Sequence, residues 1–122
     1  MNALNWFEIP ATDIHRATRF YSAIFALELQ PFEMYPGSYM IMLPYKPSEG
    51  VGGAVVSGAG YEPSTNGTMV YLNGGVDLND ILYRVEGAGG KIVSSKYSIG
   101  ENGFVASFID SEGNKVGLHS MA

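Results

Sequence analysis

The sequence lacks cysteine, a basic cluster and a long apolar run. Without cysteine the chain cannot form disulfides or thiolate metal sites, and we expect a reducing, cytoplasmic location. Its 7 Lys and Arg residues are outnumbered by 12 Asp and Glu residues. Because phosphate binding needs grouped cations, nucleic acid is not an expected partner. No apolar run approaches the roughly 18 residues that span a bilayer, and the N-terminal segment has no secretion-signal pattern, so no membrane partner is expected.

What the chain does have is enough apolar sequence for one core. It contains 122 residues, a length typical of a single domain over 1–122, and 46% of them are hydrophobic. Its 16 glycines fall mostly between short apolar runs. This pattern is typical of short strands joined by tight turns.

The first half predicts a strand followed by a helix. Asn5 to Ile9 is a short apolar and aromatic run that ends at Pro10. Thr12 or Asp13 can cap a helix, because a short side-chain oxygen accepts a hydrogen bond from a free backbone N–H in the first turn. Apolar residues then recur at helical spacing: Ile14, Ala17, Tyr21, Ile24 and Phe25.

The second half repeats this order. Thr68 to Leu72 predicts a strand, and Asp77 is the expected cap of a second helix. The apolar stripe of that helix comprises Leu78, Ile81, Leu82 and Val85. Three glycines, Gly87, Gly89 and Gly90, are expected to end it.

Two Ser-Glu-Gly turns, beginning at Ser48 and Ser111, support a duplication. The interval between them is almost equal to the interval from Asp13 to Asp77, which indicates a repeated unit of about sixty residues. Each helix is followed by three predicted strands: Glu28 to Met34, Ser38 to Pro44 and Gly52 to Val56, and then Lys91 to Ser95, Gly103 to Ile109 and Lys115 to Ser120. The sequence therefore predicts an α+β fold of two strand–helix–strand–strand–strand units, over about 1–57 and 68–122, with a linker over 58–67.

Two patterns within this repeat resemble a known family. They are Asp-φ-x-x-Ala-x-x-Phe-Tyr and Asp-x-x-Gly-x-x-φ, carried by Asp13, Ile14, Ala17, Phe20 and Tyr21, and by Asp110, Gly113 and Val116. Together with the paired units they resemble the vicinal oxygen chelate superfamily of glyoxalase I, bleomycin and fosfomycin resistance proteins and extradiol dioxygenases. The nearest group is that of uncharacterised proteins related to lactoylglutathione lyase. The resemblance implies an open half-barrel sheet around a small-molecule pocket, and a homodimer.

The resemblance also implies where a divalent metal would be held. Metal-dependent members use about four side chains, usually His and Glu, one each from the first and last strand of both units. Aligned on the repeat, these positions fall on Trp6, Ala54, Val70 (or Met69) and Gly117. None of these side chains is a metal ligand. No metal and no other cofactor is therefore expected, unless the alignment is shifted.

The pocket could still hold an acid and a base. Residues two apart on a strand share a face, so Glu8 is expected beside Trp6, and Lys115 and His119 beside Gly117. A carboxylate can orient a histidine and raise its basicity, so Glu8 and His119 are candidates for metal-free acid–base catalysis. The alternative is that Glu8 is a solvated strand end and His119 a structural hydrogen-bonding group.

The remaining candidates form an apolar wall. Met40 and Met42 are adaptable thioether side chains that could line the pocket with Trp6, although ordinary core packing is the alternative. The leading hypothesis is a glyoxalase-like protein that binds a small organic molecule without metal. Whether the chain is an enzyme stays open: the alternatives are a lyase, an isomerase or a dioxygenase, either metal-free or metal-dependent, and a dimeric scaffold without ligand.

Overall fold

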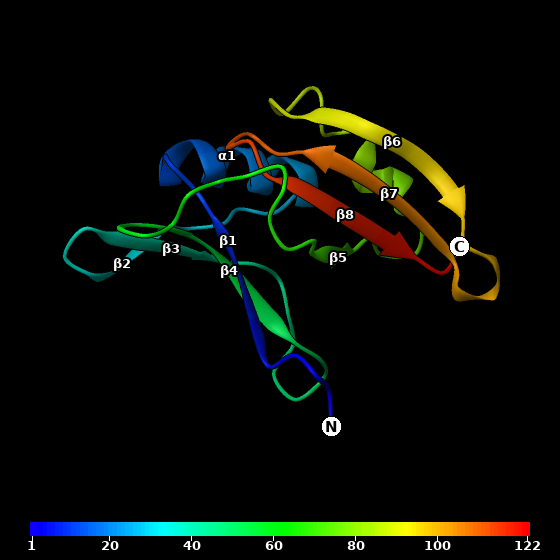
Figure 1. The fold of residues 1–122 in the computed structure, drawn as a ribbon, viewed down its shortest axis with the longest axis horizontal. Coiled ribbons are helices and arrows are strands. Elements are labelled where there is room, and N and C mark those ends of the chain that lie inside the picture. Colours follow the sequence, from blue (N-terminus) through cyan, green and yellow to red (C-terminus); the bar gives the residue numbers. More distant parts are fainter.

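The computed structural model describes all residues 1–122 and contains two four-stranded sheets (Figure 1). The first sheet has the order β1-β4-β3-β2, with β1 Trp6–Pro10, β2 Phe32–Tyr35, β3 Ser38–Met42 and β4 Gly52–Ser57. The second has the order β5-β8-β7-β6, with β5 Tyr71–Asn73, β6 Lys91–Ser98, β7 Phe104–Ile109 and β8 Lys115–Ser120. The helical segments are α1 Ile14–Phe25, α2 Asn79–Leu82 and the 3₁₀ turn η1 Gly100–Asn102. The α+β class and the two tandem units are confirmed.

The two sheets repeat the same pairing pattern. In each sheet the first strand is parallel to the last, and the other neighbours are antiparallel. The parallel register is also the same, since Trp6 faces Gly52 and Tyr71 faces Gly117. The glycine-rich segment before Ser57 forms a fully buried strand, β4, as the repeat predicted.

Helix α1 forms as expected. Asp13 caps it, with Oδ1 accepting hydrogen bonds from the backbone N–H groups of His15 at 3.0 Å and Arg16 at 3.1 Å. Such a cap stabilises a helix by about 1 kcal/mol. The helix ends at Ala26, whose φ of 54° lies in the left-handed region. The predicted apolar stripe is buried except for Phe25, and Phe20 is buried with it.

Most elements differ from their predicted bounds by a few residues; for example, β5 begins at Tyr71 and not at Thr68, and β6 extends to Ser98. For β2 and α2 the structure shows the reason. Strand β2 begins at Phe32 and not at Glu28, because Pro31 has no N–H and the N–H of Leu29 donates to Ser22 Oγ of the preceding helix. Helix α2 is a single turn, because the residues after it form turns such as Arg84 N–H to Ile81 O. The four residues of its predicted stripe are nevertheless all buried.

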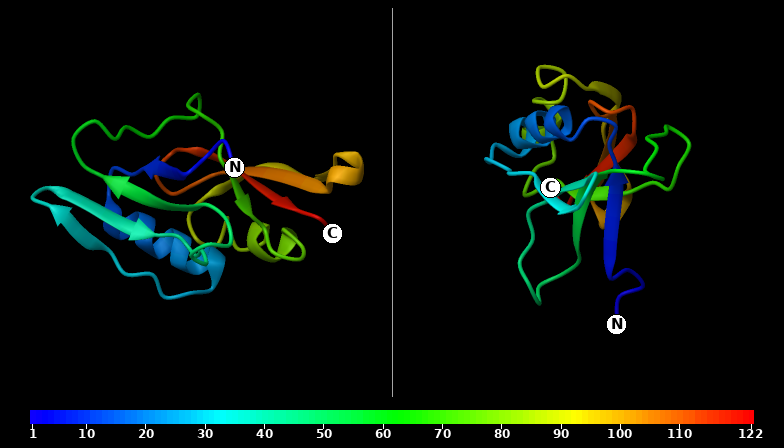
Figure 2. Two further views of the ribbon diagram at one scale, coloured as in Figure 1. Left: turned by 90° about the horizontal axis from the view of Figure 1, so that it is seen from below. Right: turned by 90° about the vertical axis from the view of Figure 1, so that its left-hand side faces the viewer.

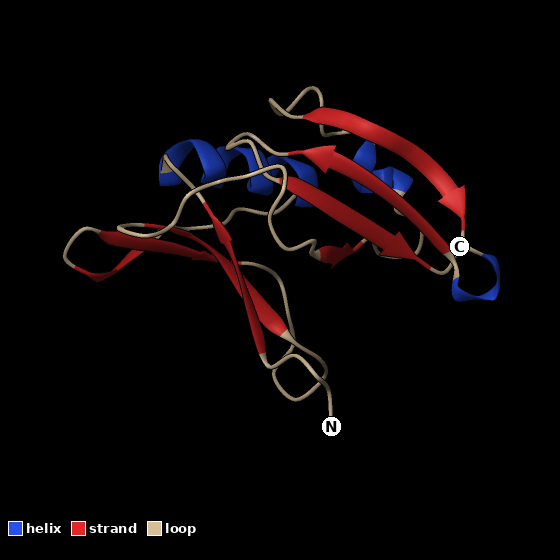
Figure 3. Ribbon diagram, viewed as in Figure 1, coloured by secondary structure: helices blue, strands red, loops and turns tan.

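One hydrophobic core of 19 buried residues joins the two units. It includes Phe20 and Ile24 of α1 and Val55 of the first sheet, together with Leu78 and Phe108 of the second unit. In Figures 2 and 3 the two sheets diverge, α1 lies against the first sheet, and the two chain ends lie beyond the outer ends of β1 and β8. No helix is both long enough and apolar enough to span a membrane.

Candidate functional site

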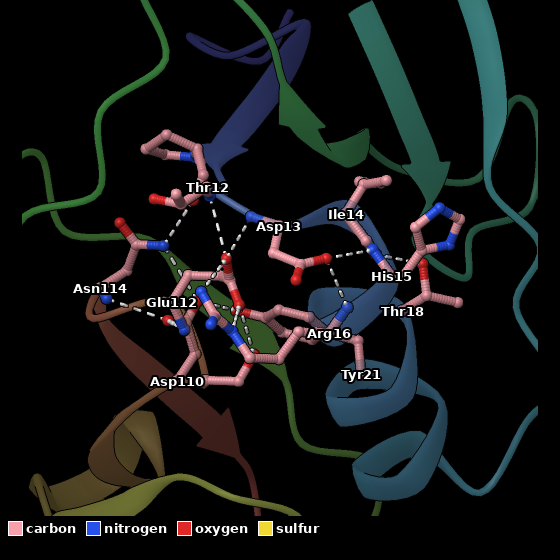
Figure 4. Close-up of polar contacts among 12 residues, drawn as sticks. Thr12, Asp13, Ile14, His15, Arg16, Thr18, Tyr21, Asp110, Glu112 and Asn114 are labelled. Carbon is pink, nitrogen blue, oxygen red and sulfur yellow. Dashed lines mark hydrogen bonds and ion pairs between the residues drawn. The ribbon is translucent and has the colours of Figure 1, made fainter.

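The buried carboxylate of Glu112 joins the second unit to the start of α1 in the first unit (Figure 4). Glu112 Oε1 accepts hydrogen bonds from the backbone N–H groups of Thr12 at 2.9 Å and Asp13 at 2.8 Å, and from Arg16 Nη2 at 3.0 Å. Its Oε2 accepts from Arg16 Nε at 2.7 Å and from the Ser111 hydroxyl at 3.0 Å. Burial raises the pKa of Glu112, but these donors outweigh burial, so its pKa lies below the ordinary value.

Asp110 and Asn114 extend these contacts into an inter-unit network. The buried Tyr21 hydroxyl donates to Asp110 Oδ2 at 2.7 Å, and burial together with the Asp110 charge raises the pKa of Tyr21 well above its ordinary value. Asn114 Nδ2 donates to Pro10 O at 2.7 Å, and Asn114 Oδ1 accepts from Ser64 N–H at 3.1 Å. The network therefore fixes the end of β1 and the linker against the start of β8.

A cleft of about 1000 Å³ lies beside this network, between β1 and β5. Its walls come from the edge of β1, the linker, β5, the start of β8 and the β3–β4 turn. More than half of its lining is hydrophobic, including Leu4, Phe25, Leu27, Leu43, Met69 and Ile81. The polar side chains that line it include Glu8, Glu62, Ser64, Asn73, Asn114 and Lys115.

Two residues predicted for the pocket, Glu8 and Lys115, line this cleft. Both are exposed, and neither takes part in an ion pair. Glu8 Oε1 accepts a hydrogen bond from the Tyr61 hydroxyl at 2.7 Å, and Oε2 accepts one from Trp6 Nε1 at 3.3 Å. The Tyr61–Glu8 hydrogen bond raises the pKa of Tyr61. Two oriented donors thus hold the Glu8 carboxylate at the edge of the first sheet.

The predicted residues Trp6, Met40 and Met42 do not line the cleft. They lie on the face of the first sheet away from α1, where Met40 faces Val56 and Met42 faces Ala54 across the β3–β4 pair. Met40, Ala54 and Val56 form a separate buried cluster, against which Met42 and Tyr61 pack. Trp6 meets the Tyr45 ring edge to face, with 6.4 Å between ring centroids.

His119 and Gly117, also predicted for the pocket, do not line the cleft either. His119 Nε2 lies 2.7 Å from Asn102 O, and the His119 side chain borders a smaller hollow of about 610 Å³ beside Tyr71. Gly117 is buried under the Tyr71 ring, since a Cβ placed there would lie 2.5 Å from that ring. The structure therefore does not bring His119 to Glu8, whose hydrogen bonds go to Trp6 and Tyr61. The catalytic roles of Glu8 and His119 stay predictions.

Strand register shows which residues face the positions that the family resemblance implied for a metal. Glu8 faces Ala54 in the parallel β1–β4 pair, and Tyr71 faces Gly117 in the β5–β8 pair. The implied positions and these facing residues together offer one carboxylate, and no group of three or more His, Cys, Asp or Glu side chains converges in the chain. These residues do not fit a divalent metal that needs about four protein ligands.

Sequence reasoning missed three tyrosines that contact residues predicted for the pocket. Tyr61 lies in the segment predicted as linker, and no local pattern marks it as a partner of Glu8. Tyr45 follows β3 and reaches Trp6 only because β1 and β4 are adjacent. Tyr71 lies within the predicted strand over 68–72, but only the parallel register of the structure places it opposite Gly117.

No family model matches the sequence, and no curated protein matches it. Solved structures do match over nearly the full chain. A glyoxalase/bleomycin resistance protein from Streptomyces sp. has a TM-score of 0.70 at 19% identity, covering 96% of this chain and 100% of that one. A glyoxalase/bleomycin resistance protein from Albidiferax ferrireducens has a TM-score of 0.69 at 14% identity, covering 99% and 100%.

A protein whose name states a function is similar as well. The fosfomycin resistance protein FosX from Listeria monocytogenes has a TM-score of 0.65 at 14% identity, covering 100% of this chain and 93% of that one. Such low identities establish likeness of fold and leave activity to be argued from the site. The chain therefore has the fold of the vicinal oxygen chelate superfamily, as its repeated patterns suggested.

Proposed function

We propose that the chain binds a small organic molecule in the cleft between β1 and β5, without a divalent metal. The observation that carries this proposal is the cleft itself. Its volume of about 1000 Å³ and its mainly apolar lining suit a ligand with an apolar body. Binding sites for small organic molecules commonly have this size and combine apolar walls with a few polar groups.

The polar groups of the cleft suggest how such a ligand is oriented. Lys115 is the cation at the β8 side, whereas Glu8 and Glu62 are carboxylates at the β1 and linker side. Since Lys115 has no ion-pair partner, it is free to meet an anionic group of a ligand. The apolar side chains would then receive the rest of the molecule.

A fluorescent probe tests this proposal. The probe 8-anilinonaphthalene-1-sulfonate has an apolar body and one anionic group, so we expect saturable binding to the folded protein. Leu27→Gln and Lys115→Met should each weaken its binding by about fivefold or more, since each removes a contact on the order of 1 kcal/mol. The matched control is Val93→Gln, which changes a similarly exposed apolar residue outside the cleft lining. Equal binding by all four proteins would reject the cleft as the site.

We also propose that the protein forms a homodimer. Several large apolar side chains are exposed, among them Phe32, Met34 and Tyr35 of the edge strand β2. Exposed apolar surface of this kind often marks an interface between subunits. Sedimentation equilibrium gives the mass directly, and a mass near 13.1 kDa at micromolar concentration would show a monomer instead.

A further inference from the structure

We propose that the face of the first sheet away from α1 carries a second binding site, one for an organic ammonium ion. Four side chains form it: Trp6, Tyr45, Tyr61 and the carboxylate of Glu8. We call these the aromatic–acid site. It shares Glu8, and no other residue, with the lining of the cleft, so substitutions at Leu27 and Lys115 test the cleft alone.

The floor of this site is set by small residues in β4. Gly52 and Ala54 lie on one face of the strand and are opposed by Trp6 and Glu8 of β1. A Cβ at Gly52 would lie 3.0 Å from the Tyr45 ring and 3.1 Å from the Trp6 ring. The absence of a side chain at Gly52 therefore lets both rings settle against the strand.

The rings of Trp6 and Tyr45 are both partly exposed. Their planes are nearly perpendicular, at 85°, and Trp6 and Tyr45 keep 36% and 46% of their surfaces exposed. In such an edge-to-face pair the edge of one ring is directed at the other ring, and the exposed part of each ring is open to a ligand. A cation is attracted to the face of an indole or phenol ring, and indole is the most favourable of the aromatic side chains.

The Glu8 carboxylate supplies the charge that such a ligand needs. It is exposed, it accepts hydrogen bonds from Trp6 Nε1 and the Tyr61 hydroxyl, and no Lys or Arg pairs with it. The nearest basic residue in sequence to Tyr45 is Lys46, which instead pairs with Glu49 at 3.9 Å. The carboxylate is thus held beside the indole ring with its charge uncompensated by the protein.

The surroundings favour an alkylated cation over an inorganic one. Met40 and Val56 lie on the same face of the sheet but are buried, with Tyr61 packed against them, so the apolar surface open to a ligand is that of the Trp6 and Tyr45 rings. A small hydrated ion gains nothing from apolar contact and would meet a single carboxylate. A quaternary or tertiary ammonium group gains both apolar contact and cation–π attraction, so the geometry points to this ligand class.

Trp6 makes the test direct, because it is the only tryptophan in the chain. Its fluorescence is followed while the protein is titrated with choline, and separately with 3,3-dimethylbutan-1-ol, the neutral analogue of the same shape. Choline should bind about five- to tenfold more tightly than the alcohol, as expected for a contribution near 1 kcal/mol from charge and cation–π attraction. Equal affinity for the two compounds, or no response to either, overturns the proposal.

Two substitutions separate charge from ring contact. Glu8→Gln keeps an oxygen that accepts the hydrogen bond from Tyr61 but removes the charge, so it should abolish the preference for choline. The control is Glu86→Gln, which changes an exposed carboxylate on the other unit and should leave the preference unchanged. Tyr45→Leu should weaken choline binding by several-fold. A preference for choline that survives Glu8→Gln would assign the signal to another site. Leu27→Gln, in the cleft, should not alter it, so that failure of one proposal is distinguishable from failure of the other.

Discussion

The buried Glu112 carboxylate meets the Arg16 guanidinium across 96 residues of sequence, with 2.7 Å between Oε2 and Nε. Glu49, at the same place in the other Ser-Glu-Gly turn, is two-thirds exposed and lies 3.9 Å from Lys46. The duplicated turn therefore has two roles. In the second unit it joins the units, and in the first it stays in solvent near the mouth of the cleft, which Val51 lines.

Replacing Glu112 should destabilise the protein far more than replacing Glu49. Glu112→Ala leaves the backbone N–H groups of Thr12 and Asp13 without their partner, so we expect the free energy of unfolding to fall by about 2–4 kcal/mol. Glu49→Ala breaks an exposed pair and should cost less than about 0.5 kcal/mol. Urea denaturation of the two variants measures both values. Similar losses would mean that the inter-unit network does not stabilise the fold.

Acid should weaken the folded state through three carboxylates. A backbone hydrogen bond from Arg16 lowers the pKa of Asp13, and a backbone hydrogen bond from Asn79, with Lys96, lowers the pKa of Asp77. The pKa of Glu112 is lowered as well, despite its burial. As the pH falls, the unfolded chain therefore binds more protons than the folded chain. The three carboxylates stabilise the folded state above the ordinary carboxyl pKa of about 4, and this stabilisation is lost below it.

The measurement is the melting temperature from pH 7 to pH 3. We expect it to change little down to about pH 5 and then to fall. In the Glu112→Gln variant the fall should be shallower, because one of the three groups no longer titrates. An unchanged slope in that variant would place the acid sensitivity elsewhere in the chain.

Much of the fold could be predicted because the repeat compensates for weak local signals. The segment over 52–57 has poor strand propensity, yet its counterpart in the second unit alternates well, and β4 forms as that comparison implied. Element ends were less predictable. Ser22, whose hydroxyl holds Leu29, lies seven residues before the residue that it binds, and no local pattern marks such a contact.

The site was less predictable than the fold, since register decides which side chains meet. In the β1–β4 pair the neighbour of Ala54 is Glu8, whereas Trp6, two residues earlier on β1, is the neighbour of Gly52. Alternation correctly placed Trp6 and Glu8 on one face but could not show that β1 and β8 belong to different sheets. For that reason it placed His119 near Glu8, whereas the two residues line different hollows.

Divalent ions should not stabilise the protein. Among the four implied positions and the residues that face Ala54 and Gly117, only Glu8 has a His, Asp or Glu side chain, and no three such side chains converge. Because a ligand stabilises a fold only as far as it binds the folded state, we expect less than about 1 °C change in melting temperature at a tenfold excess of Zn²⁺, Ni²⁺ or Mn²⁺. A larger rise that disappears in Glu8→Gln would instead restore a metal centre at this position.

Two nearby glycines should respond oppositely to alanine. At Gly90 a Cβ would lie 2.5 Å from Ile109 O, 2.7 Å from the Phe20 ring and 2.9 Å from Val85, all parts of the packed core. We expect Gly90→Ala to cost about 1–3 kcal/mol, because backbone and core side chains must move apart. At Gly87 the nearest atom lies 4.0 Å away and φ is not positive, so Gly87→Ala should be neutral or stabilise by up to about 1 kcal/mol through the unfolded state. Thermal melts of the two variants test whether the turn after α2 packs against α1, as the shared core requires. If Gly90→Ala is as stable as Gly87→Ala, the second unit does not pack closely on Phe20. The core that joins the two units would then be less tightly packed than in the structure.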